Sequence, residues 1–160
     1  MKNKFRILLL AAVCVLSMIL VSCGGEKAYP VEFSLSDVTA KAGDIISVDL
    51  TVTSTADANA FALHQLKYDE NVLEFIGFGE LGDAGKKSVF GEMGLDNTDR
   101  VISILLNEAE VLTGKICEVK FKVKDNAKAG TSDVSMSCVV KNSSNQLSSI
   151  VRSGSVTVEG

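Results

Sequence analysis

The sequence is poor in the side chains that most catalytic sites require. Its 160 residues include a single histidine, His64, and no tryptophan. Without a second histidine or a reactive cysteine, neither a hydrolase triad nor a tetrahedral zinc set can be assembled. The carboxylates are numerous, but they are scattered over the polar positions of alternating stretches, which is typical of a solvated β-surface. We therefore expect a structural His64, no enzymatic activity and no cofactor.

Two segments bring short oxygen ligands close together, Asp57-Ala58-Asn59 and Asp96-Asn97-Thr98-Asp99. Neither segment has the central glycine and the terminal glutamate of an EF-hand calcium loop. Asp and Asn also favour tight turns, because their side chains accept hydrogen bonds from nearby backbone amides. We therefore interpret both segments as turns and predict no metal site.

The apolar run near the N-terminus, Ile7–Val21, is shorter than the roughly 20 residues that a membrane-spanning helix needs. Three basic residues precede it, so residues 1–22 have the parts of an export signal. The four residues that end at Cys23, Leu-Val-Ser-Cys, resemble the lipobox of bacterial lipoproteins. This resemblance implies that the signal is removed and that Cys23 is acylated. Residues 23–30 would then tether an extracytoplasmic domain to the cell membrane or to the outer membrane surface. An ordinary export signal with an incidental cysteine is the alternative.

Basic residues are in the minority once the signal is set aside. Three of the 16 basic residues and none of the 20 acidic residues lie before Cys23, which leaves a net charge of −7 from Cys23 onward. A nucleic-acid-binding protein needs a basic face to neutralise phosphates, so this balance argues against a nucleic acid partner. It also disfavours a domain that lies flat on an anionic bilayer.

From Val31 onward the apolar residues recur with a period of two, which is typical of β-strands with one buried face. Turn signals separate the alternating stretches at intervals of roughly ten residues. Short strands at this spacing predict an all-β sandwich, formed by a single domain over residues 31–160. The clearest alternating stretches are residues 31–35, 46–53, 116–124, 134–140 and 156–158.

Two cysteines remain in this domain, Cys117 and Cys138, and both fall on the apolar positions of alternating stretches. We expect both side chains to point into the core, where a thiol behaves as a small apolar group. An exported protein also permits a disulfide between them. Because geometry decides between two free thiols and a disulfide, both alternatives stay open.

Four segments resemble, in order and spacing, segments of cohesin domains. Tyr68–Phe75 is similar to the Tyr-Asp-x-x-Val-Leu-Glu segment of that family. Val38–Asp44 is similar to its first loop, residues 112–127 to its penultimate stretch, and Gly154–Val158 to its final strand. Each segment alone is also ordinary strand-and-turn sequence, so the resemblance depends on their joint order. Together they span essentially the whole of residues 31–160.

The resemblance implies a nine-stranded jelly-roll β-sandwich with a non-catalytic binding function. Cohesins recognise dockerins, which are small calcium-loaded modules on polysaccharide-degrading enzymes, and so assemble cellulosomes. The implied protein is a monomeric cell-surface module that captures a dockerin-bearing partner, with the calcium carried by that partner. One alternative is a carbohydrate-binding module of the same fold, which usually stacks sugars on planar aromatics. The absence of tryptophan, with only Tyr29 and Tyr68 as tyrosines, disfavours it. Another alternative is a structural or adhesive surface lipoprotein with a different protein partner.

The resemblance also implies which face binds. In cohesins the dockerin docks on the outer face of one sheet, whose strands correspond here to residues 60–68, 101–107 and 133–140. If Tyr68 points into the core, as the family pattern implies, alternation fixes the direction of every other side chain on these strands. On the first strand, the residues then predicted to point inward are Ala62, His64 and Leu66.

The outward side chains of these strands would form an apolar patch with a polar rim, which is typical of an interface. A one-residue slip in register would instead bury Phe61 and Leu63 and expose His64 and Tyr68. The residues that we predict to bind the partner are Phe61, Leu63, Gln65, Val101, Ser103, Leu105, Asn107 and Val139.

Overall fold

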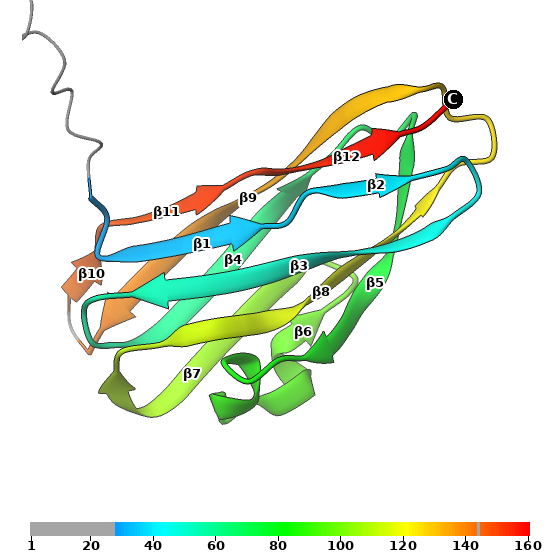
Figure 1. Cartoon of the computed structure of the whole chain (residues 1–160). Helices are drawn as coiled ribbons and strands as arrows, with labels where there is room; N and C mark the ends of the chain where they lie inside the picture. The colour runs from blue at the N-terminus through cyan, green and yellow to red at the C-terminus, as the bar shows by residue number, and fades with distance from the viewer. Residues whose placement is uncertain (1–27, 144) are drawn as a thin grey trace, which may run out of the picture.

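The computed structural model describes residues 28–143 and 145–160, and these residues form two β-sheets packed face to face (Figure 1). The predicted export signal, Cys23 and the first part of the predicted linker lie outside the described residues. Within the described ranges, no helix is long and apolar enough to cross a membrane. The all-β sandwich predicted from the alternating pattern is confirmed.

The first sheet has five strands in the order β11-β1-β3-β8-β5. Neighbouring strands run antiparallel, except that β1 and β11 pair in parallel. The bounds of these strands are Val31–Leu35 for β1, Ile45–Ser54 for β3, Leu73–Leu81 for β5, Thr113–Val123 for β8 and Ser149–Arg152 for β11.

The second sheet has the order β2-β12-β9-β4-β7-β6, and β10 also pairs with β9. The described residues hold twelve strands rather than the nine implied by the resemblance, because β2, β6 and β10 are additional segments of only two or three residues. The bounds are Val38–Ala40 for β2, Ala58–Lys67 for β4, Leu95–Asp96 for β6, Val101–Glu110 for β7, Gly130–Asn142 for β9, Asn145–Leu147 for β10 and Gly154–Val158 for β12.

The core lies between the two sheets and is filled by the inward faces of their strands. Burying an aliphatic side chain in such a core contributes about 1.5–3 kcal/mol. Phe33 of β1 meets Phe61 of β4 from the facing sheet, edge to face, with ring centroids 6.2 Å apart. On β3 the predicted alternation is confirmed, since four of its side chains are at most 8% exposed: Ile46, Val48, Leu50 and Val52.

Strand β4 contains a β-bulge that changes which of its side chains face the core. His64 pairs with Ser137 of β9 and Lys67 pairs with Ser135, so three steps along β4 match two steps along β9. Gln65, within the bulge, has a φ of 55°, in the left-handed region. The extra residue reverses the alternation. Inward side chains are therefore at odd-numbered positions just before the bulge and at even-numbered positions after it.

The prediction that Phe61 and Leu63 face outward is therefore wrong. It extended the alternation backward from Tyr68 across the bulge, where the alternation reverses. Phe61 is 2% exposed and Leu63 is fully buried. Ala62 and His64, which we predicted to point inward, are half-buried on the outer face instead.

The alternative register, a one-residue slip of the whole strand, is also only partly right. It buries Phe61 and Leu63, as observed, but it would expose Tyr68. In the structure Leu66 is buried and the Tyr68 ring packs against Phe121, with ring centroids 5.1 Å apart. Because of the bulge, both halves of β4 point their apolar side chains into the core.

Strands β7 and β9 follow the predicted alternation. Their inward side chains, each at most 8% exposed, are Ile102, Ile104, Leu106, Val134, Met136 and Val140. Cys138 shares the inward parity of β9 but is only half-buried. The outward side chains include Val101, Ser103, Leu105, Asn107 and Val139, as predicted.

Candidate functional site

The outer face of β9, β4 and β7 has a floor of small side chains along its central strand. Ala60 and Ala62 of β4 face outward there, because Phe61 between them points into the core. The cross-strand neighbours of these alanines are Leu105 and Lys141 for Ala60, and Ser103 and Val139 for Ala62. Larger side chains therefore flank a low floor.

These residues line a shallow, mostly apolar depression of about 460 Å³. Its polar contributions come from Ser103 and from Lys141 at its rim. Phe90 lines the same depression, although it lies on the connection between β5 and β6 rather than on a strand. None of the residues that line the depression takes part in an ion pair with another described residue.

The connection that carries Phe90 is hydrogen-bonded to β7 at the edge that faces away from β4. It contains two short 3₁₀ turns, Gly85–Lys87 and Gly91–Gly94. The backbone N–H of Val89 donates to the carbonyl oxygen of Leu105 at 2.8 Å, and the N–H of Leu105 donates to Ser88 Oγ at 3.3 Å. We call residues Ser88–Gly94 the wall segment, because it borders the depression on the β7 side.

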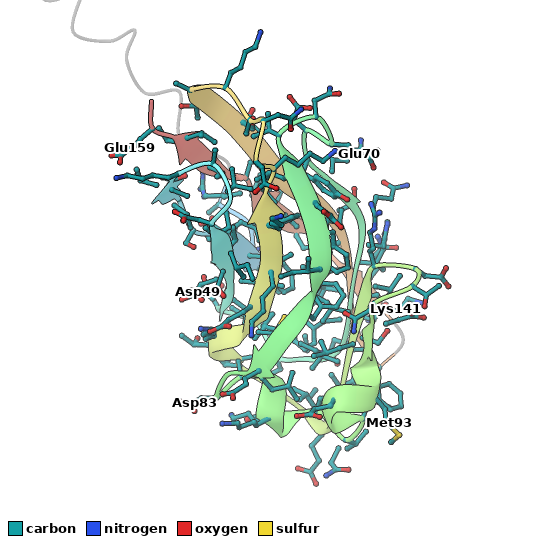
Figure 2. All side chains as sticks on the ribbon, turned by 90° about the vertical axis from the view of Figure 1, so that its right-hand side faces the viewer. Asp49, Glu70, Asp83, Met93, Lys141 and Glu159 are labelled. Atoms are coloured by element: carbon teal, nitrogen blue, oxygen red, sulfur yellow. The ribbon has the colours of Figure 1, made fainter. Side chains whose placement is uncertain are left out.

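The outer face of the other sheet is built differently, from charged side chains that pair with one another. Lys115 Nζ lies 2.7 Å from Asp49 Oδ1 and 3.0 Å from Glu118 Oε1. Hydrogen bonds to Asp49 and to Glu118 raise the pKa of Lys115, and the hydrogen bond from Lys115 lowers the pKa of Glu118. Figure 2 shows Asp49 on the side of the molecule opposite Lys141 and Met93. One outer face is therefore ion-paired, whereas the other contains an apolar depression.

Six of the eight predicted binding residues face outward, and the structure brings three of them together. Ser103, Leu105 and Val139 line the depression. Gln65 is exposed at the bulge, where its Oε1 accepts a hydrogen bond from Ser137 Oγ at 3.0 Å. Val101 and Asn107 lie on the same face outside the depression. The other two, Phe61 and Leu63, have buried side chains that point into the core, although Phe61 also borders the depression.

Five residues of the depression were absent from the prediction: Ala60, Ala62, Phe90, Ile104 and Lys141. The two alanines follow from the bulge at Gln65, which the alternating pattern does not reveal. Val89 and Phe90 form a short apolar pair in a glycine-containing stretch with no strand pattern. Such a pair, exposed between turn residues, is the available sequence signal for the wall segment.

The remaining groups with reactive side chains have structural roles. Cys117 and Cys138 are free thiols. Burial raises the pKa of Cys117 to about 12 and also raises the pKa of Cys138, so both thiols stay protonated at neutral pH and are poor nucleophiles. Asp96 Oδ1 accepts hydrogen bonds from the N–H groups of Thr98 and Asp99, as expected for a turn. No cluster of three or more His, Cys, Asp or Glu side chains is placed to hold a metal in the part of the chain that the structure describes.

The fold and the site together define a β-sandwich binding module, with ion pairs on one outer face and an apolar depression on the other. A family model of the cohesin domain matches residues 31–158. The chain therefore belongs to the cohesin family, which confirms the resemblance seen in the sequence. No curated protein is similar enough to match the chain.

Solved cohesin structures share the fold at low sequence identity. The third ScaB cohesin of R. flavefaciens, in complex with a group 1 dockerin, is 20% identical with a TM-score of 0.70, covering 84% of this chain and 99% of that one. The OlpA cohesin of Clostridium thermocellum, in complex with Doc918, is 19% identical with a TM-score of 0.62, covering 81% and 99%. CaCohA2 of Clostridium acetobutylicum is 20% identical with a TM-score of 0.62, covering 84% and 94%.

Proposed function

We propose that this chain is a non-catalytic module that captures dockerin-bearing proteins, and that it does so on the outer face of β9, β4 and β7. The observation that carries the proposal is the cohesin family match over residues 31–158. The R. flavefaciens and C. thermocellum cohesins of the same fold were each solved with a dockerin bound. The partner would belong to a polysaccharide-degrading assembly, and the calcium would be carried by its dockerin.

The apolar depression supports this choice of face. Interfaces combine a desolvated apolar centre with a polar rim, and the depression offers Leu105 and Val139 at its centre with Ser103 and Lys141 beside them. The opposite outer face would have to desolvate the ion pairs of Lys115 before it could bind a partner. The free energy of association therefore favours the apolar face.

The proposal is tested by titrating the purified module with calcium-loaded dockerin modules from its own genome, using calorimetry. We expect at least one dockerin to bind with a stoichiometry of one. Because the calcium belongs to the dockerin, a chelator should abolish binding while leaving the melting temperature of the isolated module unchanged. If none of these dockerins binds in the presence of calcium, the proposed function is wrong.

We further propose that Cys23 is acylated and holds the module outside the cell membrane. Strand β1 begins at Val31, so seven residues separate Cys23 from Val31. Seven residues reach at most about 25 Å, which would keep the folded module close to the lipid surface. Captured proteins would then be retained at the cell surface.

Replacing the lipidated cysteine tests the anchor. Cys23→Ala should remove the acyl chains, since the modified thiol is lost, and leave uncleaved precursor or released soluble protein. Metabolic labelling with a fatty-acid analogue measures this, and we expect the label in the parent protein alone. Cys14→Ala is the matched control, because Cys14 would leave with the signal, and it should be labelled like the parent. Equal labelling of Cys23→Ala and the parent would contradict the anchor.

A further inference from the structure

Exposed apolar side chains are concentrated in the wall segment, Ser88–Gly94. Six large apolar residues of the described chain are substantially exposed, and three of them lie in this short stretch: Val89, Phe90 and Met93. Met93 is 87% exposed and Phe90 is 40% exposed. Figure 2 shows Met93 on the same side of the molecule as Lys141, so the wall segment extends the apolar face beyond β7.

The wall segment is held in place by backbone contacts and by the hydroxyl of Ser88 rather than by its apolar side chains. Besides the two hydrogen bonds to Leu105, its last residue, Gly94, lies so close to β7 that a Cβ atom there would be 2.2 Å from the carbonyl oxygen of Ser103. Only glycine permits this approach. Phe90 and Met93 are therefore presented from a fixed backbone, which reduces the entropy lost when a partner binds.

Part of the sheet edge on each side of this face is already occupied by other segments. On its far side from β4, strand β9 pairs with β12 and β10, and the outer edge of β7 is occupied by β6 and by the wall segment. The depression lies on the face of the sheet rather than at an edge, so a partner that covers it contacts side chains. Across the face, β9 to β7 spans two strand spacings, or about 10 Å, which matches the width of an α-helix with its side chains.

Charge at the depression also limits the partner. Lys141 lines its rim and makes no ion pair with any described residue. No residue that lines the depression carries a carboxylate, and the two carboxylates of β7, Glu108 and Glu110, lie at the end of that strand outside the depression. A carboxylate on the partner would complement this rim, whereas a basic side chain would be repelled.

We propose that the wall segment and Lys141 determine which dockerin this chain accepts: one that presents a helix with a large apolar side chain, to contact Phe90 and Met93, and a carboxylate, to pair with Lys141. This inference depends on the proposed function, because it specifies the partner of the same face. It assigns partner selection to a loop that lies outside the regular strands of the sheet.

The probe for the test is the calcium-loaded dockerin that binds the unmodified protein most tightly in the titrations above. Phe90→Ala combined with Met93→Ala should weaken its binding by about tenfold or more, because exposed apolar anchors are desolvated in the complex. Ile45→Ala combined with Ile76→Ala is the matched control, since both residues are exposed apolar side chains of the other sheet. The control should bind within about twofold of the unmodified protein.

Charge reversal at Lys141 tests the second part of the proposal, which is the pairing of Lys141 with a carboxylate of the partner. Lys141→Glu should weaken binding by about tenfold, with a smaller loss at high salt, because screening weakens the repulsion between like charges. Lys128→Glu, at an exposed lysine outside the depression, should change affinity little. All variants should keep the melting temperature of the unmodified protein to within a few degrees.

The outcomes separate this inference from the proposed function. If the unmodified protein binds a dockerin but neither the wall variant nor Lys141→Glu weakens binding more than its control, the proposed function stands and this inference is wrong. If the unmodified protein binds no dockerin, both are wrong. Loss of affinity in both variants with unchanged controls supports the inference.

Discussion

Replacing Phe61 with alanine is expected to lower the free energy of unfolding by about 3–5 kcal/mol. The side chain is 2% exposed, and its ring packs edge to face against Phe33 of the facing sheet. Truncation removes this contact and leaves a cavity between two sheets that cannot close around it. For a domain of this size, the loss lowers the melting temperature by about 10 °C or more. A thermal melt of the purified variant measures the shift.

The same truncation at an exposed phenylalanine provides the control. Phe90 is 40% exposed on the wall segment, so Phe90→Ala should cost no more than about 1 kcal/mol of stability. The two variants thus compare one chemical change in two environments. Equal melting temperatures for the two variants would contradict the inward position of Phe61 and, with it, the bulge at Gln65.

The second large effect is expected in binding. Ala62→Arg should weaken dockerin binding by about a hundredfold or more, equivalent to about 2.7 kcal/mol. Ala62 lies on the central strand of the face, between Ser103 and Val139, where its small side chain forms the floor of the depression. An arginine there would fill the space that a helix of the partner needs. Calorimetric titration of the variant measures the loss.

Thr53→Arg is the matched control for this substitution. Thr53 is exposed on β3, on the outer face of the other sheet. The substitution at Thr53 introduces the same arginine side chain, but on an outer face that the proposal leaves free of the dockerin. Thr53→Arg should therefore bind the dockerin like the unmodified protein. Equal losses in the two variants would mean that the effect is not specific to the apolar face.

The period-two pattern was sufficient to predict the fold and most of the residue directions. On β3, β7 and β9 the apolar positions of the pattern point into the core and all but Cys138 are buried, because a regular strand must alternate and one face of each strand covers the core. The pattern failed on β4, where the bulge at Gln65 reverses the alternation. Gln65 carries no sequence mark of a bulge, since it is neither glycine nor asparagine, and the pairing with β9 is a long-range property.

The position of the wall segment against β7 could not be predicted from the sequence, for a related reason. Its position depends on hydrogen bonds to Leu105, which is a distant residue on another strand. Nothing in the local sequence of Ser88–Gly94 specifies that contact, and a loop pattern leaves the direction of Phe90 open. The resemblance could therefore indicate a sheet and a face for the proposed site, whereas the floor and the wall of the depression required the three-dimensional structure.

The most direct test of the central claim is the footprint of the bound dockerin on the module. Amide chemical shifts of the isotope-labelled module are recorded by NMR before and after addition of the unlabelled, calcium-loaded dockerin. We predict that the largest changes occur at Ala60, Ala62, Leu105, Val139 and the wall segment, with β3 and β8 nearly unaffected. A footprint on the outer face of β3 and β8, around Asp49 and Lys115, would contradict the account.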